Sequence, residues 1–239
     1  MKVAVIRFPG SNCDLDMMAA LKTIEGIEPS LVWHGDDSFG DRDYGAIILP
    51  GGFSFADRLR AGAIAASSPA MSVVKRRAGR GIPVLGVCNG FQILVESGLL
   101  PGALLRNSTL KFVCEWTHVR VESTRTPFTS GLREGQVLAL PIAHGEGRFY
   151  LQPAELARIE REGMVAFRYC DAAGRSTPGS NPTGTLHNIA GVRNKEGNVV
   201  GLMPHPERAS AAPSSPFGGS DGSLILSSLL VKAARVLRA

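Results

Sequence analysis

The segment from residue 84 to residue 92 constrains the fold of this chain more than any other. It opens with a short apolar run, places Cys88 between Gly86 and Gly90, and continues with helix-forming residues. This order predicts a buried strand, a sharp corner at the cysteine and then a helix, because such a corner tolerates only small neighbours. The positive end of that helix would face the sulfur and favour thiolate, the nucleophilic form. The segment therefore favours cysteine-based acyl transfer over the alternative, a small buried core residue.

Short apolar runs alternate with helical segments along most of the chain. Because alternating strands and helices pack as a parallel sheet covered on both faces, we expect an α/β fold. Residues 111–122 alternate in polarity, which is typical of a half-exposed antiparallel strand. Residues 211–222 are rich in Pro, Ser and Gly and predict a surface loop, and without a clean linker we expect a single domain over residues 1–239. The other predicted strands are 2–7, 46–49, 82–87, 165–170, 189–192 and 199–203, and the predicted helices are 15–25, 59–66, 70–78 and 224–237.

The composition limits the classes of protein to consider. With 239 residues and 44% hydrophobic content, the chain can bury one substantial core. The net charge of +5 is dispersed, and the one basic cluster, at residues 75–80, has no interleaved aromatic residues, so we expect no nucleic-acid partner. The sequence has no apolar run of membrane-spanning length and no signal-peptide pattern at its start, so we expect no membrane partner.

The cysteines stand at positions 13, 88, 114 and 170, far apart and without C-x-x-C spacing. This pattern disfavours both a zinc knuckle and a disulfide framework, so we expect no metal site and a reducing, cytoplasmic location. The sequence also lacks the glycine-rich motifs of ATP and dinucleotide sites. We therefore expect no cofactor on this chain.

Cys88 needs a general base, and His205 is the strongest candidate among the five histidines. It follows a predicted strand, and ligands of open α/β sheets collect where the strands end. Prolines on both sides favour an extended backbone, in which Glu207 would project to the same side as His205. A carboxylate there would orient the imidazole, as the third member of a catalytic triad does. Each residue alone also fits a structural role, but together they favour catalysis.

Attack by Cys88 would create an oxyanion, which needs two hydrogen-bond donors. The Asn89 N–H is one candidate, and the turn at Gly51, Gly52 and Phe53 offers a second, because glycines let backbone approach a substrate closely. A Gly-Gly dipeptide more often simply ends a strand.

Two further polar residues have open assignments. Gln92, one helical turn after Cys88, could bind a polar substrate or be a solvated helix residue. His144 lies in a Gly-rich loop with Glu146, and the two could line a pocket or form a structural turn. Their H-x-E spacing is shared with zinc deaminases, but no P-C-x-x-C follows.

Together these motifs resemble the class I glutamine amidotransferases. The resemblance is carried by residues 86–92 around the cysteine, by the Pro-Gly-Gly turn at 50–52 and by the His-Pro-Glu at 205–207. Further segments narrow the resemblance to the glutaminase subunit of phosphoribosylformylglycinamidine synthase, over essentially the whole chain. They are residues 8–14, 51–54, 59–64, 143–147, 188–191 and 203–208.

The resemblance implies a flavodoxin-like open sheet, mostly parallel with some antiparallel strands. It implies Cys88 as the nucleophile, His205 as the general base and Glu207 as the residue that orients it. Glutamine would be held near Gln92, His144 and the backbone of residues 51–53. Ammonia would pass to a separate large synthetase subunit that binds ATP and Mg, and a small bridging subunit would complete the assembly.

One segment departs from the family pattern. Phe55 and Ala56 stand where the family has tyrosine and glycine. If position 56 requires a positive φ, alanine would strain the loop.

Two other functions remain open from the residues alone. The chain could be a stand-alone cysteine amidohydrolase of the same fold that needs no partner. It could also be a non-catalytic redox or regulatory module in which Cys88 is an oxidisable thiol. The second alternative leaves the His205–Glu207 pairing unexplained.

Overall fold

The computed structural model describes residues 1–211 and 215–236. Its strands are β1 (Lys2–Arg7), β2 (Glu28–Trp33), β3 (Ala46–Leu49), β4 (Val84–Val87), β5 (Ala103–Leu105), β6 (Val113–Val121), β7 (Val137–His144), β8 (Arg148–Tyr150), β9 (Val165–Cys170), β10 (Ile189–Arg193) and β11 (Val199–Leu202). Its α-helices are α1 (Asp14–Lys22), α2 (Pro69–Gly79), α3 (Asn89–Glu96), α4 (Pro153–Arg161) and α5 (Asp221–Val236).

Nine strands within the described ranges form one open sheet, in the order β2-β1-β3-β4-β11-β10-β9-β6-β7. Neighbours from β2 to β11 run parallel, and neighbours from β11 to β7 run antiparallel. The parallel part has the flavodoxin-like strand order, with β11 in the fifth place. This confirms the expected α/β fold with an open sheet that combines parallel and antiparallel strands.

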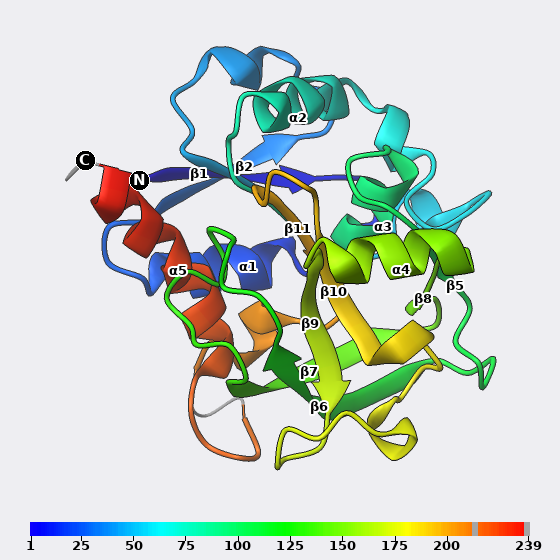
Figure 1. The fold of residues 1–239 in the computed structure, drawn as a ribbon. Coiled ribbons are helices and arrows are strands. Elements are labelled where there is room, and N and C mark those ends of the chain that lie inside the picture. Colours follow the sequence, from blue (N-terminus) through cyan, green and yellow to red (C-terminus); the bar gives the residue numbers. More distant parts are fainter. Residues whose placement is uncertain (212–214, 237–239) are drawn as a thin grey trace.

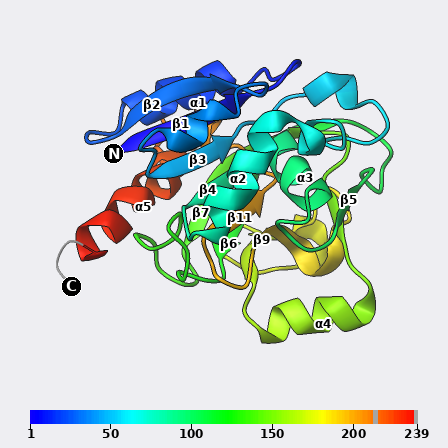
Figure 2. The ribbon, with the colours of Figure 1, turned by 90° about the horizontal axis from the view of Figure 1, so that it is seen from above.

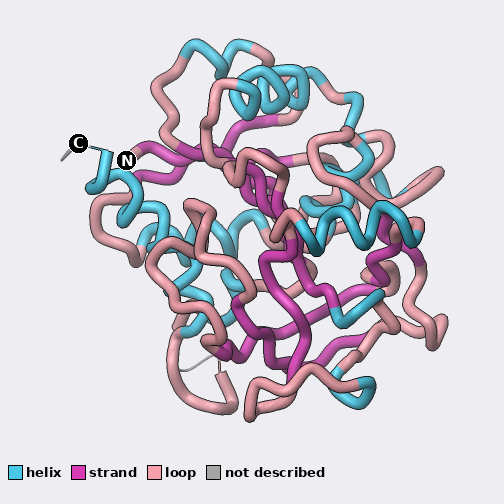
Figure 3. Tube along the Cα trace, in the orientation of Figure 1, coloured by secondary structure: helices cyan, strands magenta, loops and turns pink. Residues whose placement is uncertain are grey.

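The central strands are buried because helices cover both faces of the sheet. Every residue of β3, β4 and β11 is buried, which suits their uninterrupted apolar sequences. α1 and α2 lie on opposite sides of β1 (Figures 1 and 2). The strands run through the middle of the molecule, with the helices and the longer loops outside them (Figure 3).

Most predicted elements are confirmed within a few residues. Strands 2–7, 46–49 and 165–170 match β1, β3 and β9, and the alternating segment 111–122 forms β6, antiparallel to both its neighbours. Helix 224–237 corresponds to α5, although residue 237 lies outside the described residues, as do residues 212–214 of the predicted loop. The sequence did not reveal strands β2, β5, β7 and β8 or helix α4.

The helix predicted at 59–66 is wrong. The segment consists of turns, and its one helical piece is a short 3₁₀ turn, Ala65–Ser67. Leu59 and Gly62 have φ values of 69° and 84°, which a helix does not allow. A Cβ on Gly62 would lie 2.7 Å from the backbone nitrogen of Ile93, so the loop packs directly against α3. This tertiary contact overrides the helical propensity of the segment.

The sheet brings two distant parts of the sequence to one edge. β4 and β11 are parallel neighbours, with Val87 opposite Leu202 at their carboxyl ends. The Cys88 N–H donates to the Leu202 carbonyl at 2.8 Å, which extends this pairing past the end of β4. The residues that follow these two strands therefore meet at the same place. No helix of the described residues has the length and apolar character needed to cross a membrane.

Candidate active site

Cys88 stands at a strained corner between β4 and α3. Its φ and ψ are 50° and −106°, a conformation that non-glycine residues rarely adopt. Both flanking glycines are required by close packing: a Cβ on Gly86 would lie 2.6 Å from the Gly90 carbonyl oxygen, and a Cβ on Gly90 only 1.9 Å from that of Leu49. The predicted corner is confirmed, but the side chain is 5% exposed and lies at the wall of a pocket instead of in open solvent.

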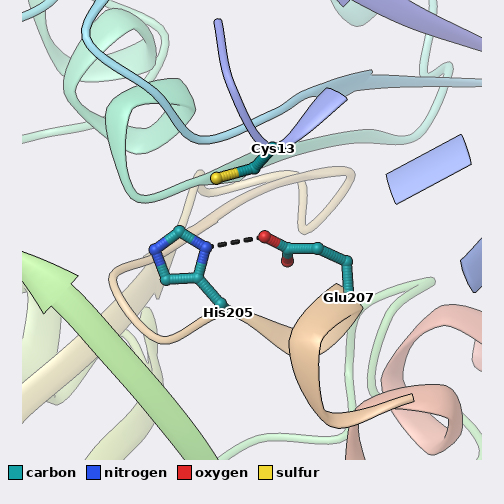
Figure 4. A group of neighbouring side chains, drawn as sticks. All are labelled: Cys13, His205 and Glu207. Atoms are coloured by element: carbon teal, nitrogen blue, oxygen red, sulfur yellow. Dashed lines mark hydrogen bonds and ion pairs between the residues drawn. The ribbon is translucent and has the colours of Figure 1, made fainter. Parts of the chain in front are cut away.

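His205 and Glu207 form a buried pair beside this corner. The Nδ1 atom of His205 lies 2.6 Å from Oε1 of Glu207, and both side chains are almost fully buried (Figure 4). The predicted pairing is present, but its local geometry differs from the extended stretch that was expected. His205 caps a short 3₁₀ helix, η6 (Pro206–Ala209), and the turn of that helix brings Glu207 back to the ring.

The electrostatics of His205 suit a base that shares a proton with a thiol. Burial lowers the pKa of His205, but the charge of Glu207 and the neighbouring Cys88 outweigh it, so its pKa stands well above the ordinary value. Cys88 lies close enough to the ring for its charge to contribute, and the Nε2 atom of His205 is buried without a hydrogen-bond partner among the described residues. Thiol, imidazole and carboxylate therefore converge from β4 and β11, as the sequence predicted.

A second buried cysteine lies against the same histidine. Donor atoms of Cys13, His205 and Glu207 lie within 4.8 Å of one another, and the Cys13 side chain points toward the pair (Figure 4). The Arg208 guanidinium donates to the Cys13 sulfur at 3.1 Å, which places positive charge where a metal cation would sit. This arrangement favours packing beside His205 over metal binding. No role was predicted for Cys13, although its place just after β1, at the same sheet edge, was a signal.

In the turn at residues 51–53, one residue packs behind His205 and the other two line the pocket. Gly51 does not line the pocket: it lies behind the His205 ring, where an added Cβ would be 2.7 Å from Cε1. Gly52, with φ of 150°, lines the pocket, as does Phe53. The Phe53 N–H donates to the Gly10 carbonyl at 2.9 Å, so it is not a free oxyanion donor in this structure. Gly52 and Asn89 remain the predicted oxyanion donors.

Gln92 connects the elements around the pocket instead of pointing into solvent. Its Nε2 donates to the Glu146 carbonyl at 2.7 Å, and its Oε1 accepts from Asn89 Nδ2 at 2.9 Å. The Asn89 side chain in turn accepts from the Ser54 N–H at 3.1 Å. This chain of hydrogen bonds ties the loop after β3, the start of α3 and the loop after β7 together. Its existence could not be inferred from the sequence, because it depends on tertiary positions.

His144 is buried in the wall of the pocket, together with Cys88 and Gln92. Its Nδ1 lies 3.3 Å from the Asn107 side-chain oxygen, whereas its Nε2 has no partner among the described residues. Burial, with a smaller contribution from His205, lowers the pKa of His144 to about 3, so its ring is neutral at neutral pH. A neutral ring with one free nitrogen can exchange a hydrogen bond with a bound ligand.

The loop after β3 has the positive φ at position 56 that would strain an alanine. Phe55, Ala56 and Asp57 have consecutive φ values of 54°, 56° and 51°.

We expect Ala56→Gly to raise the free energy of unfolding by roughly 0.5–1 kcal/mol, because glycine adopts this conformation without the Cβ clash. Urea denaturation of the wild type and the variant would measure the difference in the free energy of unfolding. Ala66→Gly, in the short 3₁₀ turn, is the matched control and should lower stability; equal destabilisation by both changes would contradict the strain.

A thiol beside a buried histidine–carboxylate pair, at the carboxyl edge of an open α/β sheet, is an arrangement suited to acyl transfer through a cysteine. Residues 1–221 match the family described as the CobB/CobQ-like glutamine amidotransferase domain. The match covers most of the chain, and the chain belongs to this family.

Individual relatives cover nearly its full length. The chain is 55% identical over 230 residues to the phosphoribosylformylglycinamidine synthase subunit PurQ of Thermomicrobium roseum, covering 96% of this chain and 95% of that protein. It is 50% identical over 237 residues to the subunit of the same name from Gloeobacter violaceus, covering 99% and 100%. Among solved structures, PurLQS from Thermotoga maritima matches with a TM-score of 0.83 and 42% identity, over 97% of this chain and 98% of the other.

Proposed function

We propose that this chain is the glutamine-hydrolysing subunit of a phosphoribosylformylglycinamidine synthase. The observation that carries the chemistry is the convergence of Cys88 with the buried His205–Glu207 pair at the ends of β4 and β11. The full-length similarity to subunits of that name carries the biological assignment. Together they support the proposed reaction and the pathway step to which it contributes.

The reaction follows from the positions of the three groups. His205 takes the thiol proton, and the Cys88 sulfur attacks the carbon of the glutamine side-chain amide. The imidazolium then returns the proton to the departing nitrogen, so ammonia leaves and a glutamyl thioester remains on Cys88. Water, activated by His205, cleaves that thioester and releases glutamate with the free thiol. Glu207 keeps the ring oriented and stabilises its charged form in both halves.

The ammonia is used by a partner. In our proposal an ATP-dependent synthetase subunit, which also binds Mg, amidates formylglycinamide ribonucleotide, and a small third subunit completes the complex. The PurLQS structure supports an assembly of three components, with this chain in the position of the Q component. ATP and Mg belong to the partner in this scheme, and this chain needs no cofactor. The free cysteines at 13, 88, 114 and 170 are in keeping with a cytoplasmic location.

Reconstitution tests the proposal. We expect the chain, mixed with the synthetase and small subunits of the same organism, to support glutamine-dependent amidation of formylglycinamide ribonucleotide, with 1:1 release of glutamate. We also expect the partners to raise its glutaminase rate. Glutamine hydrolysis that is fast without partners and unaffected by them would instead establish a stand-alone amidohydrolase. Absence of glutamine hydrolysis in the full mixture, with Cys88 readily oxidised, would favour the redox module.

A further inference from the structure

The pocket that contains Cys88 also contains charged groups that the hydrolytic chemistry does not use. Its volume is about 250 Å³, room for one small molecule. Besides Cys88 and His144, its wall includes the carboxylates of Asp57 and Glu146 and the basic side chains of Arg106 and Lys111. Both signs of charge therefore stand near the nucleophile.

The negative charges of the two carboxylates are not balanced equally by neighbouring groups. Glu146 lies 3.6 Å from the Arg106 guanidinium, a partly exposed ion pair. Asp57 has no basic partner among the described residues, and its Oδ1 atom is buried without a hydrogen-bond donor. Burial of an unpaired carboxylate is costly unless something supplies positive charge or donors. The Asp57 carboxylate therefore has a hydrogen-bond acceptor without a donor among the described residues, and it lines the same pocket as Cys88.

The backbone at Asp57 has a strained conformation. Its φ of 51° follows two residues that are also in the left-handed region, and the loop is anchored to α3 through the Ser54–Asn89 hydrogen bond. The loop is thus fixed with its acid at the pocket wall. His144, almost fully buried with a free Nε2, lines the same pocket. This unpartnered nitrogen is a second, independent indication that the pocket binds a polar ligand.

These features match the chemistry of an α-amino acid. When the side-chain amide of glutamine reaches Cys88, its Cα end carries an ammonium group and a carboxylate into the rest of the pocket. We propose that Asp57, together with Glu146, binds the α-ammonium group of glutamine and thereby selects α-amino acid amides over amides that lack this group. The inference rests on the proposed function, and it gives a specificity-determining role to Asp57, for which the sequence predicted none, and to Glu146, which the sequence marked only as a possible pocket residue.

The test compares two substrates on the assembled three-subunit enzyme. One is glutamine, and the other is 4-carbamoylbutanoate, which has the same amide and carboxylate but no α-amino group. We expect Asp57→Asn to lower kcat/KM for glutamine by about 10- to 100-fold, mainly through KM, because one charge-assisted hydrogen bond is lost. The rate with 4-carbamoylbutanoate should change by less than about threefold, since that substrate never used the charge. Glu146→Gln should shift selectivity in the same direction.

Controls separate this role from a structural one. Glu134→Gln, an exposed acid outside the pocket, should leave both substrates unchanged. Asp57→Asn should unfold at a temperature no lower than the wild type, because it removes an uncompensated charge, and it should retain ammonia-dependent amidation. An equal loss with both substrates, or no loss with glutamine, would overturn the inference. Failure of the wild-type assembly to hydrolyse glutamine would overturn the proposed function and the inference with it.

The pH dependence provides a second readout. Burial, together with the charge of Glu146, raises the pKa of the Asp57 carboxyl to about 6. The ammonium group binds the ionised form, so kcat/KM for glutamine should fall as the pH drops through 6. The other groups that face Asp57 across the pocket are Cys88, Arg106, Lys111 and His144, and they are unchanged in Asp57→Asn. That variant should therefore lose this acidic limb, and a limb of equal steepness in both enzymes would contradict the assignment.

Discussion

Replacing Cys88 by alanine is expected to abolish glutamine-dependent amidation by the assembled enzyme while leaving its ammonia-dependent reaction intact. The loss should reach at least about 10⁴-fold, since removal of a catalytic nucleophile leaves only the contributions of binding and oxyanion stabilisation. Ammonia supplied from solution bypasses the thioester, so the synthetase half should be unaffected. The measurement is the rate of product formation with saturating glutamine and, separately, with an ammonium salt.

The matched control is Cys114→Ala, because Cys114 is an exposed cysteine on β6 that does not line the pocket. It should retain both reactions. Equal loss of the glutamine- and ammonia-dependent reactions in Cys88→Ala would show that the change disrupts the assembly instead of the chemistry, and it would contradict the role of Cys88. A melting temperature near that of the wild type would confirm that the corner still folds.

The second large effect is expected for Glu207→Gln, which keeps the size of the side chain but removes its charge. We expect kcat for glutamine hydrolysis to fall by about 10²- to 10⁴-fold, because the ring loses both its orientation and the stabilisation of its charged form. The charge of Glu207 is a main reason why the pKa of His205 stands above its ordinary value. Its removal should lower that pKa, so that the imidazolium form is lost at a lower pH than in the wild type.

Two measurements check this prediction. One is the pH profile of kcat, and the other is the rate at which Cys88 reacts with iodoacetamide, which reports thiolate. Both should change in Glu207→Gln, whereas Glu155→Gln, an exposed acid on α4, should resemble the wild type. A kcat within about threefold of the wild type would show that the buried 2.6 Å contact between His205 and Glu207 serves stability alone.

The sequence predicted those parts of the fold that depend on local pattern. The strand, corner and helix around Cys88 could be inferred because a sharp corner requires glycine at positions 86 and 90 for local steric reasons. In the structure, carbonyl oxygens lie too close to both glycines to leave room for a Cβ atom. The uninterrupted apolar strands of the parallel part were likewise visible. β2 was not, because it is an edge strand that contains Pro29 and two polar residues and so lacks an apolar signature.

The parts of the site that depend on tertiary contacts were harder to predict. The pairing of His205 with Glu207 was expected from an extended backbone. The structure forms the pair in another way, through the turn of the 3₁₀ helix η6. The Phe53 N–H was assigned as an oxyanion donor, but the loop after β1 accepts its hydrogen bond through Gly10. Asp57 was overlooked because nothing in the sequence shows that its loop folds back to the pocket. Short-range motifs predicted the thiol and the histidine that the structure brings together, and long-range packing determined the other residues of the pocket wall.

The adjacency of β4 and β11 has a consequence for the synthesis of the protein. The ribosome makes the thiol-bearing corner early, but the strand that positions the histidine comes from the last fifth of the chain and inserts between β4 and β10. A nascent or truncated chain that ends before β11 therefore carries Cys88 without His205 beside it. Incomplete copies released in the cell would consume no glutamine, and ammonia production begins only after the centre of the sheet has closed.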